Sequence, residues 1–73
     1  MSDLDARLLA ADAAGNLPDL VALYIEAADA AEVEAAAGFY LTHAYVFALE
    51  AGLSKAGVIR ARLIAMGRET PAG

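Results

Sequence analysis

The chain has 73 residues, enough for one small domain, and it contains no cysteine, which excludes disulfides and thiolate metal sites. Hydrophobic residues make up 60% of it and the net charge is −5. A domain this short buries only about 60% of the surface that its unfolded chain exposes, so tight helix packing or association with another chain has to supply stability.

Charge is unevenly distributed along the chain. Residues 1–50 hold nine acidic residues against Arg7, whereas residues 51–73 hold four basic residues against Glu69. The acidic start, MSDLDARLLA, lacks the basic residues that open a signal peptide. Residues 35–49 carry no charge, but a membrane-spanning helix needs about 20 residues. We therefore expect a cytoplasmic protein that is neither exported nor inserted into a membrane.

The first predicted helix begins at Ser2, which with Asp5 forms an approximate capping box, and continues to about Ala14. Gly15–Asn16 follows, and this pair suits the left-handed turn that ends a helix. The apolar stripe of this helix consists of Leu4, Leu8 and Ala11.

The second predicted helix covers about residues 18–30, with Pro18 in its first turn, where a missing N–H has no cost. This helix is amphipathic. Its apolar positions recur with helical spacing at Leu20, Tyr24, Ala27 and Ala31. The opposite side carries Asp19, Ala22, Glu26 and Asp29. No glycine or proline marks its end, but two acids, Glu32 and Glu34, indicate that a new helix starts there.

The third predicted helix runs over about residues 33–51 and ends at Gly52, and Ser54 is expected to cap a fourth helix over 55–66. The apolar positions of the fourth helix are Val58, Ile59, Leu63 and Met66. Gly67 closes the domain of residues 1–67, and residues 68–73 are expected to form a flexible tail. The sequence thus predicts an all-α fold of four helices in two antiparallel α-hairpins.

Both hairpins carry elements of a known repeat. The first has Gly15–Asn16 at its turn, followed by Tyr24 and Ala27 in its second helix, and the second has LTHAY at 41–45 and Gly57 after the turn. The two turns lie 37 residues apart, a period typical of helical repeat arrays. The chain resembles the tetratricopeptide and Sel1-like repeat family. The resemblance implies a right-handed stack of hairpins that binds proteins and has no chemistry of its own. Because an array needs about three repeats, it also implies oligomerisation.

The helix over 33–51 is apolar on two sides. One side carries mostly small residues suited to close packing, namely Val33, Ala37, Tyr40, Ala44, Ala48 and Ala51. The other carries Phe39, His43, Val46, Phe47 and Glu50. We expect this second side to bind a protein partner or another copy of the chain, as a homodimer or higher homo-oligomer. The alternative is that this helix is the best-buried one and turns its aromatic residues inward.

No catalytic residue, cofactor or metal site is predicted. His43 lacks a nucleophile or a directly adjacent carboxylate, so packing or a simple hydrogen bond is its expected role, with a pH switch at an interface as the alternative. We do not expect an enzyme.

Two other functions remain open. Residues 48–63 resemble a DNA-binding helix-turn-helix through Ala48, Gly52, Leu53 and Val58, with Lys55, Arg60 and Arg62 as candidate nucleic-acid contacts. The acidic remainder of the chain would repel DNA, which makes nucleic acid the less favoured partner. As a third function, a dimer could bind a small apolar ligand between helices, lined by Tyr24, Tyr40 and Tyr45.

Overall fold

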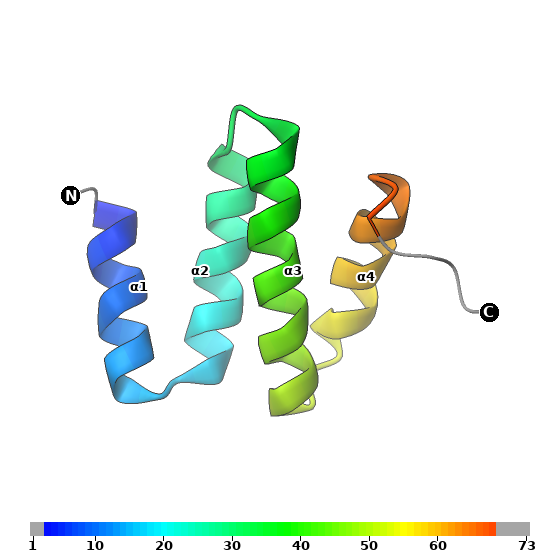
Figure 1. The fold of residues 1–73 in the computed structure, drawn as a ribbon. Helices are drawn as coiled ribbons and strands as arrows, with labels where there is room; N and C mark the ends of the chain where they lie inside the picture. Colours follow the sequence, from blue (N-terminus) through cyan, green and yellow to red (C-terminus); the bar gives the residue numbers. More distant parts are fainter. Residues whose placement is uncertain (1–2, 69–73) are drawn as a thin grey trace.

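Four helices follow one another in the computed structural model, which describes residues 3–68 and contains no strand within that range. They are α1 (Asp3–Ala14), α2 (Leu17–Ala30), α3 (Glu34–Ala51) and α4 (Lys55–Ala65). Figure 1 shows α1, α2 and α3 side by side with alternating directions, and α4 beside α3. The predicted all-α class and the four helices are confirmed.

Three of the helices end in the same way. Gly15, Gly52 and Gly67 adopt φ angles of 65°, 67° and 75°, which residues with a Cβ rarely adopt. Each glycine lets the next N–H reach back five residues: Asn16 N donates to Ala11 O (3.1 Å), Leu53 N to Ala48 O (2.9 Å) and Arg68 N to Leu63 O (2.9 Å). This is the Schellman arrangement, and it satisfies carbonyl groups that a helix end leaves without partners.

The helix starts agree less well with the sequence prediction. At α2, Asn16 Oδ1 accepts a hydrogen bond from Asp19 N (3.2 Å). Ser54 precedes α4 as predicted, but its side chain makes no capping hydrogen bond. Its backbone is already helical (φ −62°, ψ −23°), whereas a capping side chain needs an extended backbone to reach the first free N–H groups. Ser2, the other predicted cap, lies outside the described residues.

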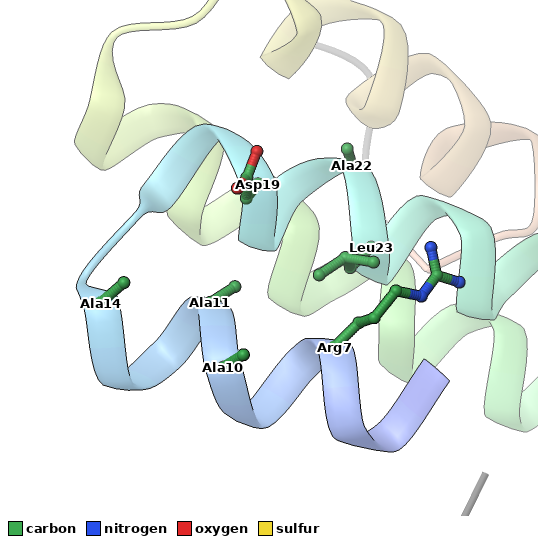
Figure 2. A pocket seen from close by; sticks show the side chains of 7 residues that line it. All are labelled: Arg7, Ala10, Ala11, Ala14, Asp19, Ala22 and Leu23. Carbon is green, nitrogen blue, oxygen red and sulfur yellow. The ribbon is translucent and has the colours of Figure 1, made fainter. Parts of the chain in front are cut away.

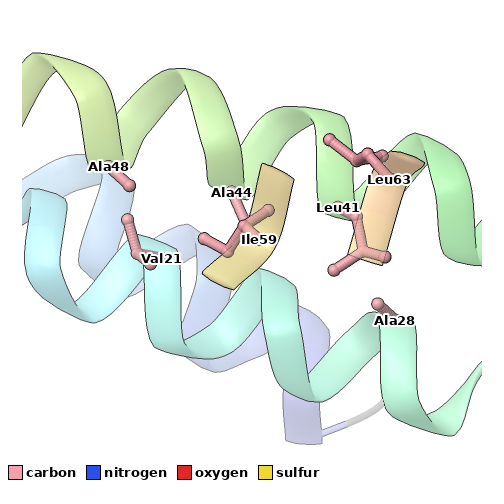
Figure 3. Close-up of a cluster of buried hydrophobic side chains, with 7 residues drawn as sticks. All are labelled: Val21, Ala28, Leu41, Ala44, Ala48, Ile59 and Leu63. Atoms are coloured by element: carbon pink, nitrogen blue, oxygen red, sulfur yellow. The ribbon is translucent and has the colours of Figure 1, made fainter. Parts of the chain in front are cut away.

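The core lies where α2, α3 and α4 meet. Figure 3 shows Val21 of α2 beside Ala48 of α3 and Ala28 of α2 near Leu41 of α3. Two branched residues of α4, Ile59 and Leu63, pack against the same cluster. The buried cluster consists of Val21, Ala28, Leu41, Ala44, Ala48, Ile59 and Leu63. The small side of α3 predicted from the sequence is therefore confirmed as a packing surface at Ala44 and Ala48, which are fully inaccessible.

Helix α1 is attached to one neighbour. It packs against α2 and, among residues 3–68, contacts neither α3 nor α4. Ala11 is its buried residue, and Arg7 bridges the two helices by pairing with Glu26 of α2 while its Nε lies 3.1 Å from Asp3 Oδ2. The resulting shape is flat, since the Cα trace measures 37 × 29 × 12 Å along its principal axes.

Two predicted packing positions are wrong. Val58 is 66% exposed and Val33 is 63% exposed. Because Ile59 and Leu63 of α4 face the core, Val58 points about 100° away from Ile59 around the helix and meets solvent. Val33 precedes the first turn of α3 in an extended conformation, so the helical wheel does not apply to it.

Arg68 belongs to the packed part of the chain. Besides its backbone hydrogen bond to Leu63, its side chain lies directly over Gly38 of α3, so that a Cβ built on Gly38 would overlap Arg68 Nε and Cδ. Residues 69–73 of the predicted tail lie outside the described residues. None of the helices formed by residues 3–68 has both the length and the apolar character that a membrane crossing requires.

Ala44→Leu is expected to lower the free energy of unfolding by about 1–3 kcal/mol, because the larger side chain has no space between α2, α3 and α4. Ala61→Leu, on the exposed side of α4, is the matched control, with an expected change within about 0.5 kcal/mol. Urea denaturation followed by circular dichroism measures both variants. Equal effects would contradict the tight packing at Ala44.

Gly38→Ala tests the contact with Arg68. In an Arg68→Ala background the substitution is expected to raise the free energy of unfolding by about 0.5–1 kcal/mol, because alanine favours the helix interior over glycine. With Arg68 present the gain is smaller, because the new methyl group displaces the arginine side chain. A double-mutant cycle measures the difference, and an identical gain in both backgrounds would exclude the contact.

Candidate interaction surface on helix α3

The structure divides the five predicted interface residues into two groups. Phe39 and Val46 are 56% and 47% exposed, and Glu50 is also exposed. His43 and Phe47 are half-buried. The side of α3 predicted as one surface is therefore partly covered within the monomer and partly open.

Tyr24 of α2 provides the cover. Its ring stacks against His43 with centroids 5.3 Å apart and an interplanar angle of 27°, and against Phe47 with centroids 5.8 Å apart. Tyr40 lies 6.2 Å from the same ring, and Phe39 lies 4.3 Å from His43. These five rings form an aromatic cluster along the edge where α2 meets α3, and such ring pairs add to the stability gained from burial alone.

A hydrogen bond and two ring contacts hold the side chain of His43. Its Nδ1 donates a hydrogen bond to the carbonyl oxygen of Phe39, one helical turn earlier, at 3.0 Å. Its ring is packed between Tyr24 and Phe39. Within residues 3–68 no three histidine or carboxylate side chains come close enough together to hold a metal ion. The contacts around His43 thus order its ring and supply packing.

A continuous apolar stripe runs along the open side of α3. Leu49, which the sequence reasoning did not include, is 56% exposed and lies one turn from Val46. We define the α3 stripe by its regular spacing of four and three residues: Ala35, Phe39, Thr42, Val46 and Leu49. This spacing is that of the a and d positions of a coiled coil. It is visible in the sequence alone and could have identified Leu49 as part of the surface.

Thr42 does not interrupt the apolar character of the α3 stripe. Its hydroxyl donates to the carbonyl oxygen of Gly38 at 2.8 Å. The donor is thereby satisfied inside the helix, and the side chain can be covered without leaving an unpaired hydroxyl hydrogen. No charged residue lies between Glu34 and Glu50, so the whole stripe is free of charge.

A shallow groove lies elsewhere, between α1 and α2, as Figure 2 shows. It is lined mostly by small residues with Arg7 and Asp19 among them, the full set being Arg7, Ala10, Ala11, Ala14, Asp19, Ala22 and Leu23. None of Tyr24, Tyr40 and Tyr45, which the sequence suggested as ligand-pocket residues, lines it.

The basic residues of α4 are placed less favourably for DNA than the motif suggests. Arg62 Nη2 donates to Asp29 Oδ1 of α2 at 2.8 Å, so this guanidinium already has an anionic partner. Arg60 is half-buried and Lys55 is exposed. Val58, an apolar position of the helix-turn-helix pattern, faces solvent.

Comparisons with known proteins give no family assignment: no protein-family model, curated protein sequence or solved structure matches this chain. The function therefore has to be inferred from the surface of the molecule itself.

The stacking on His43 can be tested by NMR, because the chain has a single histidine. Tyr24→Leu is expected to move the imidazole ring protons downfield, since the shielding by the stacked phenol ring is lost. Tyr45→Leu is the matched control, because Tyr45 is also half-buried but makes no ring contact with His43 among the described residues. Unchanged shifts in Tyr24→Leu would contradict the stacked geometry.

Proposed function

We propose that this protein is a small, cytoplasmic protein–protein interaction module that binds through the α3 stripe and has no catalytic role. The observation that carries the proposal is the exposure of Phe39, Val46 and Leu49 in one uncharged row on a single helix. Isolated exposed apolar residues are ordinary, whereas a contiguous apolar row bordered by charges is typical of a contact surface. Glu34 and Glu50 form that border.

The proposal includes the resemblance to tetratricopeptide and Sel1-like repeats. Two consecutive helical hairpins, each turned by a glycine with positive φ at equivalent positions 37 residues apart, support it. Proteins of this architecture present helix faces to other proteins, and two hairpins are fewer than an independent array needs. We therefore expect another chain to cover a helix face that so short an array leaves exposed.

Site-specific photo-crosslinking in the native cytoplasm tests this function. A photoreactive residue at position 39 is expected to crosslink to protein, because it lies within the proposed contact surface and is exposed in the monomer. Position 9 is the matched control, since Leu9 of α1 is exposed to a similar extent, 58%, but lies outside the α3 stripe.

The crosslink must also be saturable. Excess unlabelled wild-type chain is expected to suppress it at least about tenfold more effectively than the Val46→Asp chain, because a buried, unpaired carboxylate opposes docking. The photoreactive chains and the Val46→Asp chain should all fold, since substitutions at exposed positions usually change the free energy of unfolding by no more than about 0.5 kcal/mol. Equal crosslinking at positions 39 and 9, or equal suppression by the two competitors, would refute the proposed surface.

A further inference from the structure

The spacing of the α3 stripe points to a specific kind of partner. Apolar residues alternate at intervals of four and three over the exposed length of the helix, which is the pattern of a two-helix seam. We infer that a second copy of this chain covers the α3 stripe, with the two α3 helices antiparallel and related by a twofold axis near residue 44. The inference rests on the proposed function, since it names the occupant of the same surface.

The pairing of side chains selects one register. With the axis near residue 44, the a positions of one α3 meet d positions of the second copy: Phe39 with Leu49 and Val46 with Thr42. All four contacts that the symmetry generates within α3 are apolar or involve the methyl group of Thr42, whose hydroxyl is already satisfied. The register shifted by one heptad pairs Phe39 with Thr42 and Val46 with Ala35, and it leaves Leu49 beyond the start of the second α3, so it buries less apolar surface.

The charges at the two ends of α3 favour the antiparallel direction. Glu32 and Glu34 lie at its start, and Lys55 lies just beyond its end, with all three side chains exposed. An antiparallel pair brings Glu34 of each copy near Lys55 of the other, whereas a parallel pair would gather four carboxylates at one end. Opposed helix dipoles add to the preference.

The flanks of the α3 stripe hold both small and large residues, namely Ala36, Gly38, His43, Tyr45 and Glu50. Glu50 alone among these five is charged, and the side chain of Arg68 lies over Gly38. Helix α2 packs against the opposite side of α3 through Leu41, Ala44 and Ala48, so a second α3 meets no element already on that side. The pair would continue the flat layer of helices from one copy into the next.

The expected interface is small. Helix α3 has 18 residues and is about 27 Å long, so a strip one helix wide covers roughly 400–500 Å² on each copy. The total of about 1,000 Å² lies near the lower limit for a specific interface. We therefore expect a reversible dimer with a dissociation constant on the order of 10–100 µM.

Sedimentation equilibrium of the full chain tests the dimer, over concentrations from about tenfold below to tenfold above that constant. The wild type is expected to change from monomer to dimer, whereas Val46→Asp raises the dissociation constant at least about 100-fold. Leu9→Asp, on α1, is the matched control and should dimerise like the wild type. A wild type that stays monomeric throughout, or an equal loss in both variants, would overturn the dimer.

Disulfide trapping tests the direction and register of the two α3 helices. Because the chain has no native cysteine, only the introduced thiols can react. Mixed Phe39→Cys and Leu49→Cys chains are expected to form mainly the 39–49 product, since the two 39 positions lie about 15 Å apart along the helices. Products linked 39–39 or 49–49, or a statistical mixture identified by mass, would overturn the antiparallel register. Thr42→Cys with Val46→Cys provides a second pair with smaller changes in volume and the same expected preference.

The two proposals fail in distinguishable ways. A chain that stays monomeric but whose position 39 still crosslinks to other proteins in a saturable manner overturns the homodimer and leaves the interaction module standing. A chain that stays monomeric and crosslinks equally at positions 39 and 9 overturns both.

Discussion

The close approach of α2 to α3 is the contact on which the rest of this structure depends. It sets a small residue of one helix against a larger residue of the other, since Val21 of α2 lies beside Ala48 of α3 and Ala28 of α2 lies near Leu41 of α3, as Figure 3 shows. Alanine side chains let two helix backbones approach more closely than leucine would. Ile59 and Leu63 are buried against this contact, with Ala56 and Met66 partly buried beside them, so a helix as short as α4 completes the core.

A core built largely from alanine limits how much apolar surface the fold can bury. Five of the ten buried hydrophobic residues in residues 3–68 are alanines, which remove little apolar area from water. Phe39 and Leu49 lie on the side of α3 away from this core, and each is 56% exposed. The exposed apolar surface of α3 and the tight alanine packing on its opposite side are therefore two results of one arrangement.

The sequence was sufficient for the helices because their ends are marked locally. Gly15 and Gly52 fix two turns, and Pro18 and the acids near residue 33 mark two starts, so each boundary depends on a few neighbouring residues. The exposure of the α3 residues depends instead on other elements. His43 and Phe47 are half-buried because Tyr24, from a different helix, stacks on them, and no periodicity within α3 contains that information. Ser54 failed as a cap for a similar reason, since the tight turn after Gly52 gives it a helical backbone.

Helix α3 is apolar around most of its circumference, and such a helix is stable in water only when neighbours surround it. The monomer supplies α2 and α4, which cover the sides bearing Ala44 and Leu41, and it leaves the side bearing Phe39 and Val46 in solvent. Any chain that binds this side binds only the folded state, because the α3 stripe exists as a row only in the helix. Binding and folding are then linked, and a domain that is marginal by size gains stability in proportion to the logarithm of its partner's concentration. The small core and the exposed row are consistent with a protein whose fold is completed by association.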